Sequence, residues 1–262
     1  ITLSIILFIL LCSYSYSDDI QIESTNMNIV NDGKTIIANN ANIKIPAENI
    51  TIISKLARYE KISDIVTFID NVFLKDSNND VIIKSNLVKY EREKDLIYSD
   101  GKTKIEIDKI YNIDSEDVYY DRNLKKFYGS KETLIEDIDS NFYILKDGFE
   151  LDILNDIIKS KKSIIIDKNN NKYIFNNLSV NLKNNEIAGK ELKVEFEKSY
   201  FGNVNNDPLL KGRSSYSNDD ELKVYKAVFS TCNTEKKKCR GWELNSEEFK
   251  HDKNKKIFEY KN

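Results

Sequence analysis

Apolar and polar residues alternate along most of the chain. In the stretch DIVTFIDNVFLKD, which begins at Asp64, one face carries Val66, Phe68, Val72 and Leu74 and is interrupted only by Asp70. A period of two in runs rich in Ile, Val, Tyr, Phe and Thr predicts β-strands. Polar turns such as SNND, SDG and KNNN separate these runs. The sequence has no sustained helical stripe with caps, so we expect an all-β protein.

The predicted strands recur in a unit of about 31 residues. Acidic residues mark the same place in successive units at Glu60, Glu91, Asp121 and Asp152, and Lys183 continues the phase, with intervals of 31, 30, 31 and 31. Each unit holds two strands of about ten residues and two polar turns. Such units cannot close a core alone, so we expect them to stack into an elongated β-solenoid. Because both faces of several strands are apolar, we expect part of the interior to be an open hydrophobic groove.

The phase of the repeat breaks near Phe201. A loop rich in Gly, Asn and Pro follows, and strand patterns then return over residues 222–230 and 242–249. We interpret this region as the terminal unit of the same domain, with a long insertion.

The first residues, ITLSIILFILLCSYSYSDDI, have the features of an export signal. Residues 5–11 are an apolar run too short to span a bilayer comfortably, and Ser15 and Ser17 place small residues before Asp18. We expect a secretory signal peptide over residues 1–17 and an exported domain over residues 18–262. An uncleaved membrane anchor is the alternative, and Leu11 is too bulky to precede a lipid-modified Cys12.

Two of the three cysteines, Cys232 and Cys239, lie in FSTCNTEKKKCRGW beside the only tryptophan, Trp242. The two cysteines have three possible roles: metal ligands, a redox motif or a structural disulfide. A zinc site with His251 lacks a clear fourth ligand, and the C-x₆-C spacing is unusual for zinc. In an exported protein the pair predicts disulfide cysteines, whose partners stay open.

His251, the only histidine, occupies the position in the repeat that Tyr59, Tyr90 and Tyr120 hold in other units. We therefore expect it to have a structural role. Trp242 is expected to pack under the terminal strands.

Composition and missing motifs argue against several functions. The net charge is −3, with 40 basic and 43 acidic residues interspersed, so nucleic acid is not an expected partner. Neither G-x-S-x-G nor H-E-x-x-H occurs, and SDGKTK lacks the first glycine of a phosphate loop because Leu96 stands there. We expect no enzyme activity, no cofactor and no metal.

A resemblance follows from the C-terminal motifs. NDPLLKGRSSYS, VYKAVFSTC and CRGWELNSEEFKHDKNKKIFEYKN occur in this order, and the first begins at Asn206. They resemble the N-terminal periplasmic domain of the lipopolysaccharide-assembly outer-membrane proteins, the LptD or organic-solvent-tolerance (OstA) family. The upstream repeats look like the OstA-type domain that this family shares with the periplasmic lipopolysaccharide-bridge protein.

The resemblance implies a β-jelly-roll or β-taco with a hydrophobic slot for the acyl chains of lipopolysaccharide. It implies a location at the periplasmic side of the outer membrane. It also implies strand addition to the bridge protein, and a C-terminal β-barrel with a plug lipoprotein in the full-length protein. We expect the chain to be a fragment that lacks this barrel. In the family, cysteines of the N-terminal domain bond to cysteines of the barrel.

Candidate lipid contacts come from the same resemblance and from the strand pattern; they are Ile20, Ile22, Val66, Phe68, Val72 and Leu74. Ile20 and Ile22 match the apolar pair that opens the slot in the bridge protein, although ordinary core packing explains all six residues as well. Two alternatives stay open: a soluble LptA-like bridge protein, and a carbohydrate-binding or adhesin-like β-solenoid with an aromatic-lined cleft.

Overall fold

The computed structural model describes residues 20–262 apart from 201, 203–206 and 232–241. The described chain is all-β, as predicted, with two three-residue 3-10 helices as its only helices, η1 (Pro46–Glu48) and η2 (Arg92–Lys94). The strands are β1 (Gln21–Glu23), β2 (Asn26–Val30), β3 (Thr35–Ile45), β4 (Ile50–Glu60), β5 (Ile65–Asp76), β6 (Val81–Glu91), β7 (Leu96–Ile107), β8 (Tyr111–Glu116), β9 (Val118–Asp121), β10 (Lys126–Gly129), β11 (Thr133–Glu136), β12 (Phe142–Leu145), β13 (Phe149–Asp152), β14 (Ile157–Ile166), β15 (Lys172–Asn181), β16 (Glu186–Glu195), β17 (Leu209–Ser217), β18 (Glu221–Ser230), β19 (Leu244–Asp252) and β20 (Ile257–Lys261).

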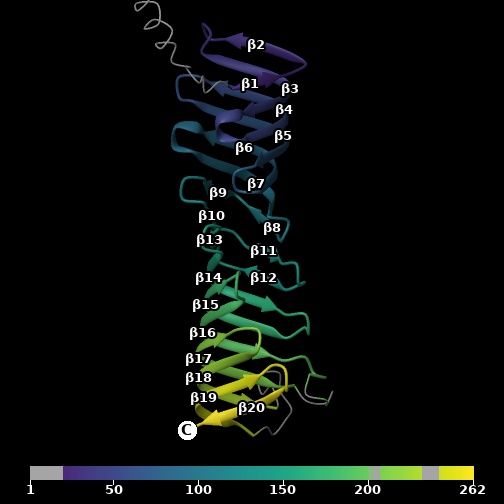
Figure 1. Ribbon diagram of the computed structural model, residues 1–262, viewed down its shortest axis with the longest axis vertical. Coiled ribbons are helices and arrows are strands. Elements are labelled where there is room, and N and C mark those ends of the chain that lie inside the picture. Colours follow the sequence, from purple (N-terminus) through teal and green to yellow (C-terminus); the bar gives the residue numbers. More distant parts are fainter. Residues whose placement is uncertain (1–19, 201, 203–206, 232–241) are drawn as a thin grey trace, which may run out of the picture.

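The strands form one elongated stack in chain order, with β1 and β2 at one end and β20 at the other (Figure 1). Neighbouring strands pair antiparallel from β3 to β7 and from β14 to β20. The two strands expected after Phe201 are β18 and β19, and both continue this ladder, but β17 comes before them and was not expected.

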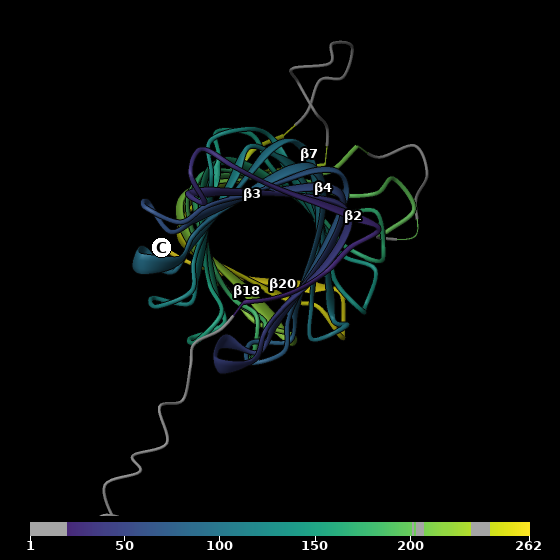
Figure 2. The ribbon, with the colours of Figure 1, turned by 90° about the horizontal axis from the view of Figure 1, so that it is seen from above.

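Each long strand bends near its middle, and the bends line up as a corner that runs along the stack. The corner residues Asn40, Asp70 and Gly101 all have positive φ, and the register shifts beside Asp70 between Ile69 and Val72. Asp70, which interrupts the apolar face of β5, is therefore the residue at which that strand turns. Seen along the long axis, the strands wrap around one shared interior (Figure 2).

The corner divides the stack into two walls. In the middle of the molecule the strands break at the corner into short halves: β9, β10 and β13 belong to the first wall, and β8, β11 and β12 to the second. Only β7 and β14 pair with strands of both walls in this region, so the pairings close a ring in the order β7-β8-β11-β12-β14-β13-β10-β9.

Hydroxyl groups stabilise the bends from inside. The Ser54 hydroxyl donates to the carbonyl of Leu56 at 3.0 Å, and the Thr103 hydroxyl donates to the carbonyl of Gly101 at 3.0 Å. Both side chains are buried. A bend removes a ladder hydrogen bond, and an unpaired buried carbonyl costs stability, so a nearby hydroxyl is the natural replacement.

The predicted repeat is confirmed in register. Glu60, Glu91, Asp121 and Asp152 end β4, β6, β9 and β13, and the cross-strand pairs connect them in one row. The next member of the row is Asn181, which pairs with Ile157 opposite Asp152, so the assignment to Lys183 was wrong. The unit is two residues shorter there, and Lys183 lies in the following turn.

Turns at the strand ends form two columns. Column A, at the ends of the first wall, contains residues 31–34, 61–64, 92–95, 122–125, 153–156, 182–185, 218–220 and 253–256. Column B, at the ends of the second wall, includes residues 46–49, 77–80, 108–110, 137–141 and 167–171. Residues of columns A and B and the adjoining strand ends meet along one line. We call this line the seam.

Candidate functional site: the apolar interior and its seam

The candidate lipid contacts of β5 lie in the interior. Val66, Phe68, Val72 and Leu74 share the inward face, as predicted, and none is more than 2% exposed. At these positions the interior is filled by side chains and is not the open groove that we expected. The physical reason is the seam, which brings the free ends of the two walls together.

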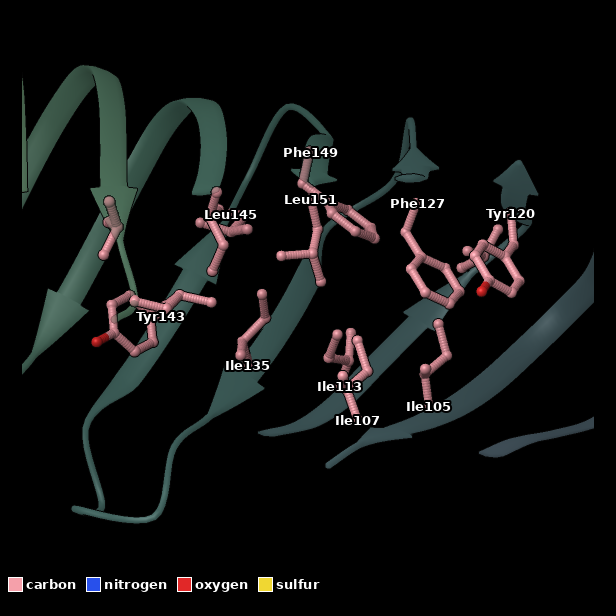
Figure 3. Packing of buried hydrophobic residues seen from close by; sticks show 14 of the residues in the cluster. Ile105, Ile107, Ile113, Tyr120, Phe127, Ile135, Tyr143, Leu145, Phe149 and Leu151 are labelled. Carbon is pink, nitrogen blue, oxygen red and sulfur yellow. The ribbon is translucent and has the colours of Figure 1, made fainter. Parts of the chain in front are cut away.

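The interior remains apolar through the broken middle of the stack. Isoleucines and aromatic residues from both walls point toward one another there (Figure 3). Within the first wall, the cross-strand neighbours Tyr120 and Phe127 stack with ring centroids 4.1 Å apart and planes 6° apart. The buried cluster extends from Ala38 near the N-terminal end to Phe249 near the C-terminal end, so one apolar column runs along most of the molecule.

At the N-terminal end of this column, the described residues leave inward-facing side chains exposed. Ile20 and Ile22 pack against the core and are half-buried, and Ile22 pairs with Ile43. Met27 and Ile29 pair with the inward-facing row of β3 but are 40% and 62% exposed. Among the described strands, β1 and β2 each pair only with β3, so both present a free edge.

At the C-terminal end, too, the described residues leave an inward-facing side chain exposed. Phe258 pairs with His251, and Tyr260 pairs with Phe249, so both belong to inward rows. Tyr260 is nevertheless 60% exposed. Among the described strands β20 pairs only with β19, which leaves a second free edge.

A buried ion pair joins the seam near its N-terminal end. Arg122, from column A, donates from Nε to Oδ2 of Asp76 at 2.9 Å, and Asp76 lies at the end of the second wall. The Asp76 side chain is fully buried and that of Arg122 is 5% exposed. Arg122 also bonds to Asp95 and donates to the Glu48 carbonyl at 3.0 Å, while the Tyr120 hydroxyl donates to Asp76 at 3.1 Å.

A second arginine closes the adjoining turn. Arg92 donates to Oε1 of Glu48 across the seam at 3.1 Å and to Oδ1 of Asp64 at 3.0 Å. The Tyr90 hydroxyl donates to Oδ1 of Asp95 at 2.7 Å and lies 2.5 Å from Oε2 of Glu48. The eight side chains form what we call the arginine network: Glu48, Asp64, Asp76, Tyr90, Arg92, Asp95, Tyr120 and Arg122.

The buried pair of Asp76 and Arg122 keeps its charges at neutral pH. Burial by itself raises the pKa of Asp76, but hydrogen bonds from Arg122 and Asn79 outweigh burial and leave that pKa below its ordinary value. Burial by itself lowers the pKa of Arg122, because it disfavours the cation. The carboxylates of Asp76 and Asp95 outweigh burial and raise that pKa. Burial and the Asp76 carboxylate raise the pKa of Tyr120, which therefore remains a hydrogen-bond donor.

Aromatic side chains close the seam at the C-terminal end. Phe196 and Tyr200 lie on the side of column B, and their rings are 5.5 and 5.7 Å from the ring of His251 on the other side. Phe258 lies 4.8 Å from His251, and the Lys256 amino group lies 4.9 Å above the Tyr200 ring. Together with Phe229 and Phe249, these rings form the aromatic cluster: Phe196, Tyr200, Phe229, Phe249, His251 and Phe258.

His251 has the predicted place in the repeat. Cross-strand pairs put it in the row that also contains Tyr59, Tyr90 and Tyr120, and it is fully buried. Burial first, and the charge of Lys253 second, lower the pKa of His251 to about 4. The imidazole is therefore neutral at physiological pH and packs as an aromatic ring.

The middle of the seam is held differently. The Tyr111 hydroxyl on the side of column B donates to the carbonyl of Leu182 in column A at 3.4 Å, which is long for a hydroxyl. Burial and the carboxylates of Asp80 and Asp156 raise the pKa of Asp108. Asp108 is in column B and Asp156 in column A, so like charges face each other here.

Other candidate residues fall elsewhere. Trp242 is 55% exposed and meets only the edge of Phe229 in the ring contacts of the described chain, with centroids 5.9 Å apart, so the expectation that it packs under the terminal strands was wrong. It lies just after residues 232–241, which are outside the described residues, and two positions before β19 begins. Cys232, Cys239 and the signal peptide predicted over residues 1–17 lie outside the described residues.

Sequence reasoning missed the arginine network, although a signal was present. The chain has only five arginines among its 40 basic residues. Two of them, Arg92 and Arg122, directly follow the repeat acids Glu91 and Asp121. Arginine forms planar, two-pronged contacts with carboxylates that lysine cannot reproduce, so a rare arginine at a repeated position indicates a buried ion pair.

No protein-family model and no curated protein matches this chain. Within the described residues, no helix is long and apolar enough to cross a lipid bilayer.

Proposed function

We propose that this chain is a periplasmic domain of the outer-membrane lipopolysaccharide translocon, with an OstA-like β-jelly-roll or β-taco fold of stacked 31-residue units. Its interior receives the acyl chains of lipopolysaccharide and passes them to a β-barrel for insertion in the outer leaflet. The observation that supports this most is the apolar column, which continues along the stack and ends, in the part of the chain that the structure describes, in exposed inward-row side chains such as Ile29 and Tyr260.

The physical chemistry of acyl transport favours such an interior. Each CH₂ group removed from water contributes about 0.8 kcal/mol, so a chain of twelve carbons gains roughly 10 kcal/mol inside an apolar column. An interrupted column would expose the chain to water at each gap. A continuous one keeps the chain in apolar surroundings along the whole stack once the walls have parted to admit it.

The free edges support a role between two partners. β2 and β20 each leave one side unpaired in the described chain, and inward side chains such as Ile29 and Tyr260 are exposed beside them. Exposed edges normally invite aggregation, whereas strand addition by a neighbouring β-stack pairs the edge and covers the apolar end. The lipopolysaccharide-bridge protein and the protein's own barrel are the partners we propose.

Photo-crosslinking tests the proposal with a matched pair of positions in one strand. Benzoylphenylalanine at Phe68, which is fully buried, is expected to capture lipopolysaccharide in cells. The same group at Phe73, which points outward under Lys84, is expected to capture none. Benzoylphenylalanine at the half-buried Ile22 repeats the test with little disturbance of packing. A folded protein that captures no lipopolysaccharide from Phe68 or Ile22 would overturn the proposal.

A second candidate, glycan binding by a carbohydrate-binding or adhesin-like surface, is favoured by one feature. Tyr98, Tyr119 and Tyr128 are cross-strand neighbours on the outward face of the first wall, with ring centroids 5.1 and 5.4 Å apart. Cross-strand aromatic pairs also stabilise sheets, so the ladder has a structural explanation as well. Titration with soluble oligosaccharides separates the two, because only a glycan site loses binding in a Tyr119→Ala variant.

A further inference from the structure

An acyl chain can enter the filled interior only if the two walls move apart. At β5 the inward side chains are at most 2% exposed, and a void beside Ile83, Ile97 and Tyr120 is too small for a water molecule. Within the described residues the chain passes from one wall to the other only at the corner and never at the seam, so the walls part most easily at the seam. The acyl chain then enters from the side at the point where the seam separates most easily.

Both ends of the seam resist parting. At the N-terminal end, separation breaks the contacts of Arg122 with Asp76 and of Arg92 with Glu48. At the C-terminal end, it exposes the rings of the aromatic cluster, including the fully buried Phe249.

The middle of the seam resists least. Across it, the described contact is the long hydrogen bond of Tyr111 to Leu182, and the facing carboxylates of Asp108 and Asp156 repel each other. Parting the walls here lengthens the distance between like charges and returns a hydroxyl and a carbonyl to water. Neither polar change is costly, so the remaining cost is the exposure of apolar side chains such as Leu182 and Ile153, and parting uncovers apolar side chains at every level of the seam.

The sheet itself is also weakest at this level, which is an independent observation. The strands β8 to β13 have four to six residues each, whereas β3 to β7 have eleven or twelve. At this level only β7 and β14 run through the corner and pair with strands of both walls. Short halves joined at a break change their angle more readily than one continuous strand.

We propose that acyl chains enter and leave the interior sideways through the middle of the seam, between the column B turns at 108–110 and 137–141 and the column A turns at 153–156 and 182–185. A guest that passes there meets Ile107, Ile113 and Leu151, which line the interior directly beneath (Figure 3). This side opening rests on the proposed function, since it assigns the route by which the same interior is loaded.

Charge variants of the full chain test the opening by the rate at which a nonionic, pyrene-labelled monoacylglycerol associates in stopped-flow fluorescence. Asp156→Lys turns the repulsion with Asp108 into attraction, so the association rate is expected to fall at least fivefold. The double variant Asp108→Lys/Asp156→Lys places two cations opposite each other and is expected to return the rate part of the way to that of the wild type, because Asp137 and Asp139 beside Tyr111 still attract the introduced lysines. Because the probe carries no charge, long-range electrostatic attraction to the protein does not affect the association rate of either variant.

Glu93→Lys is the matched control. It makes the same charge change in an exposed turn of column A near the N-terminal end, and its rate is expected to equal that of the wild type. An Asp156→Lys protein as fast as Glu93→Lys, or a double variant as slow as the single one, overturns the side opening. If the wild-type protein takes up no probe at all, the proposed function itself fails.

Discussion

The two ends of the seam close the same gap with opposite chemistry. Near the N-terminus the walls are joined by Arg122 and Asp76, two charges withdrawn from water and paired at 2.9 Å. Near the C-terminus they are joined by the rings of Phe196, His251 and Phe258, which carry no charge at neutral pH. The repeat supplies the same scaffold in both places, so the difference comes from which side chains follow each strand.

The difference matters because the two chemistries fail in different ways. A buried ion pair adds little net stability compared with an apolar replacement, but removing one partner leaves an uncompensated charge. An aromatic cluster stabilises through buried area and tolerates exchange of one ring for another of similar volume. We therefore expect the N-terminal end to depend strictly on its residues, and the C-terminal end to depend on volume and neutrality.

The largest effect is expected from Arg122→Met. The substitution keeps an apolar stem but leaves the fully buried Asp76 carboxylate without its cation. Removal of one partner of a buried pair costs about 3–5 kcal/mol, so the free energy of unfolding in urea should fall by that amount. Arg58→Met, which breaks an exposed pair with Glu60, should cost no more than about 1 kcal/mol.

The double variant Arg122→Met/Asp76→Asn sharpens this test. With both charges removed, the amide introduced in place of the Asp76 carboxylate keeps hydrogen-bond partners in Tyr120 and Asn79, and at least half of the lost stability should return. A double variant as unstable as Arg122→Met alone would show that the arginine stabilises by packing and not by compensating Asp76.

The alternating pattern of the sequence was sufficient to predict the strands, the stacking repeat and the row that contains Tyr90 and His251. These features depend on period two and on an interval near 31, and both are visible in one chain. The inward face of β5 was likewise predictable, because Val66 and Leu74 keep the same parity on both sides of the bend at Asp70.

The seam could not be predicted from the same pattern. Arg92 reaches Glu48 over 44 positions, and Arg122 reaches Asp76 over 46, which is about one and a half repeats. The offset depends on how far the walls are staggered around the interior, and this stagger is a three-dimensional property of the bends. For the same reason the sequence suggested an open groove where the seam closes it.

Lowering the pH should weaken one end of the seam before the other. His251 binds a proton at about pH 4 in the folded protein, whereas an unfolded chain binds it near pH 6.5. Since the unfolded state takes up the proton first, stability falls as the pH drops from 6.5 to 4, by about 3 kcal/mol in total. The Asp76 pKa is lowered, so the contribution of Asp76 is lost only as the pH falls below the ordinary value of 3.8.

His251→Phe is the control for this window, because the chain has no other histidine. Urea unfolding at pH 6.5 and at pH 4.5 should show a clear loss of stability for the wild type and a much smaller loss for the variant. A slope that persists in His251→Phe would assign the pH dependence to carboxylates and remove His251 from the comparison.

The smallest effects on the free energy of unfolding are expected from replacing tyrosine by phenylalanine at two points of the seam. Tyr120→Phe removes a hydroxyl that donates to the buried Asp76 at 3.1 Å, and hydrogen bonds to charged groups contribute about 1.5–3 kcal/mol. Tyr111→Phe removes only the 3.4 Å contact with the Leu182 carbonyl and should cost about 0.5 kcal/mol or less. Both losses are measured by urea unfolding at pH 7. If Tyr111→Phe costs as much as Tyr120→Phe, the middle of the seam is held as firmly as its N-terminal end, and the contrast between the two regions disappears.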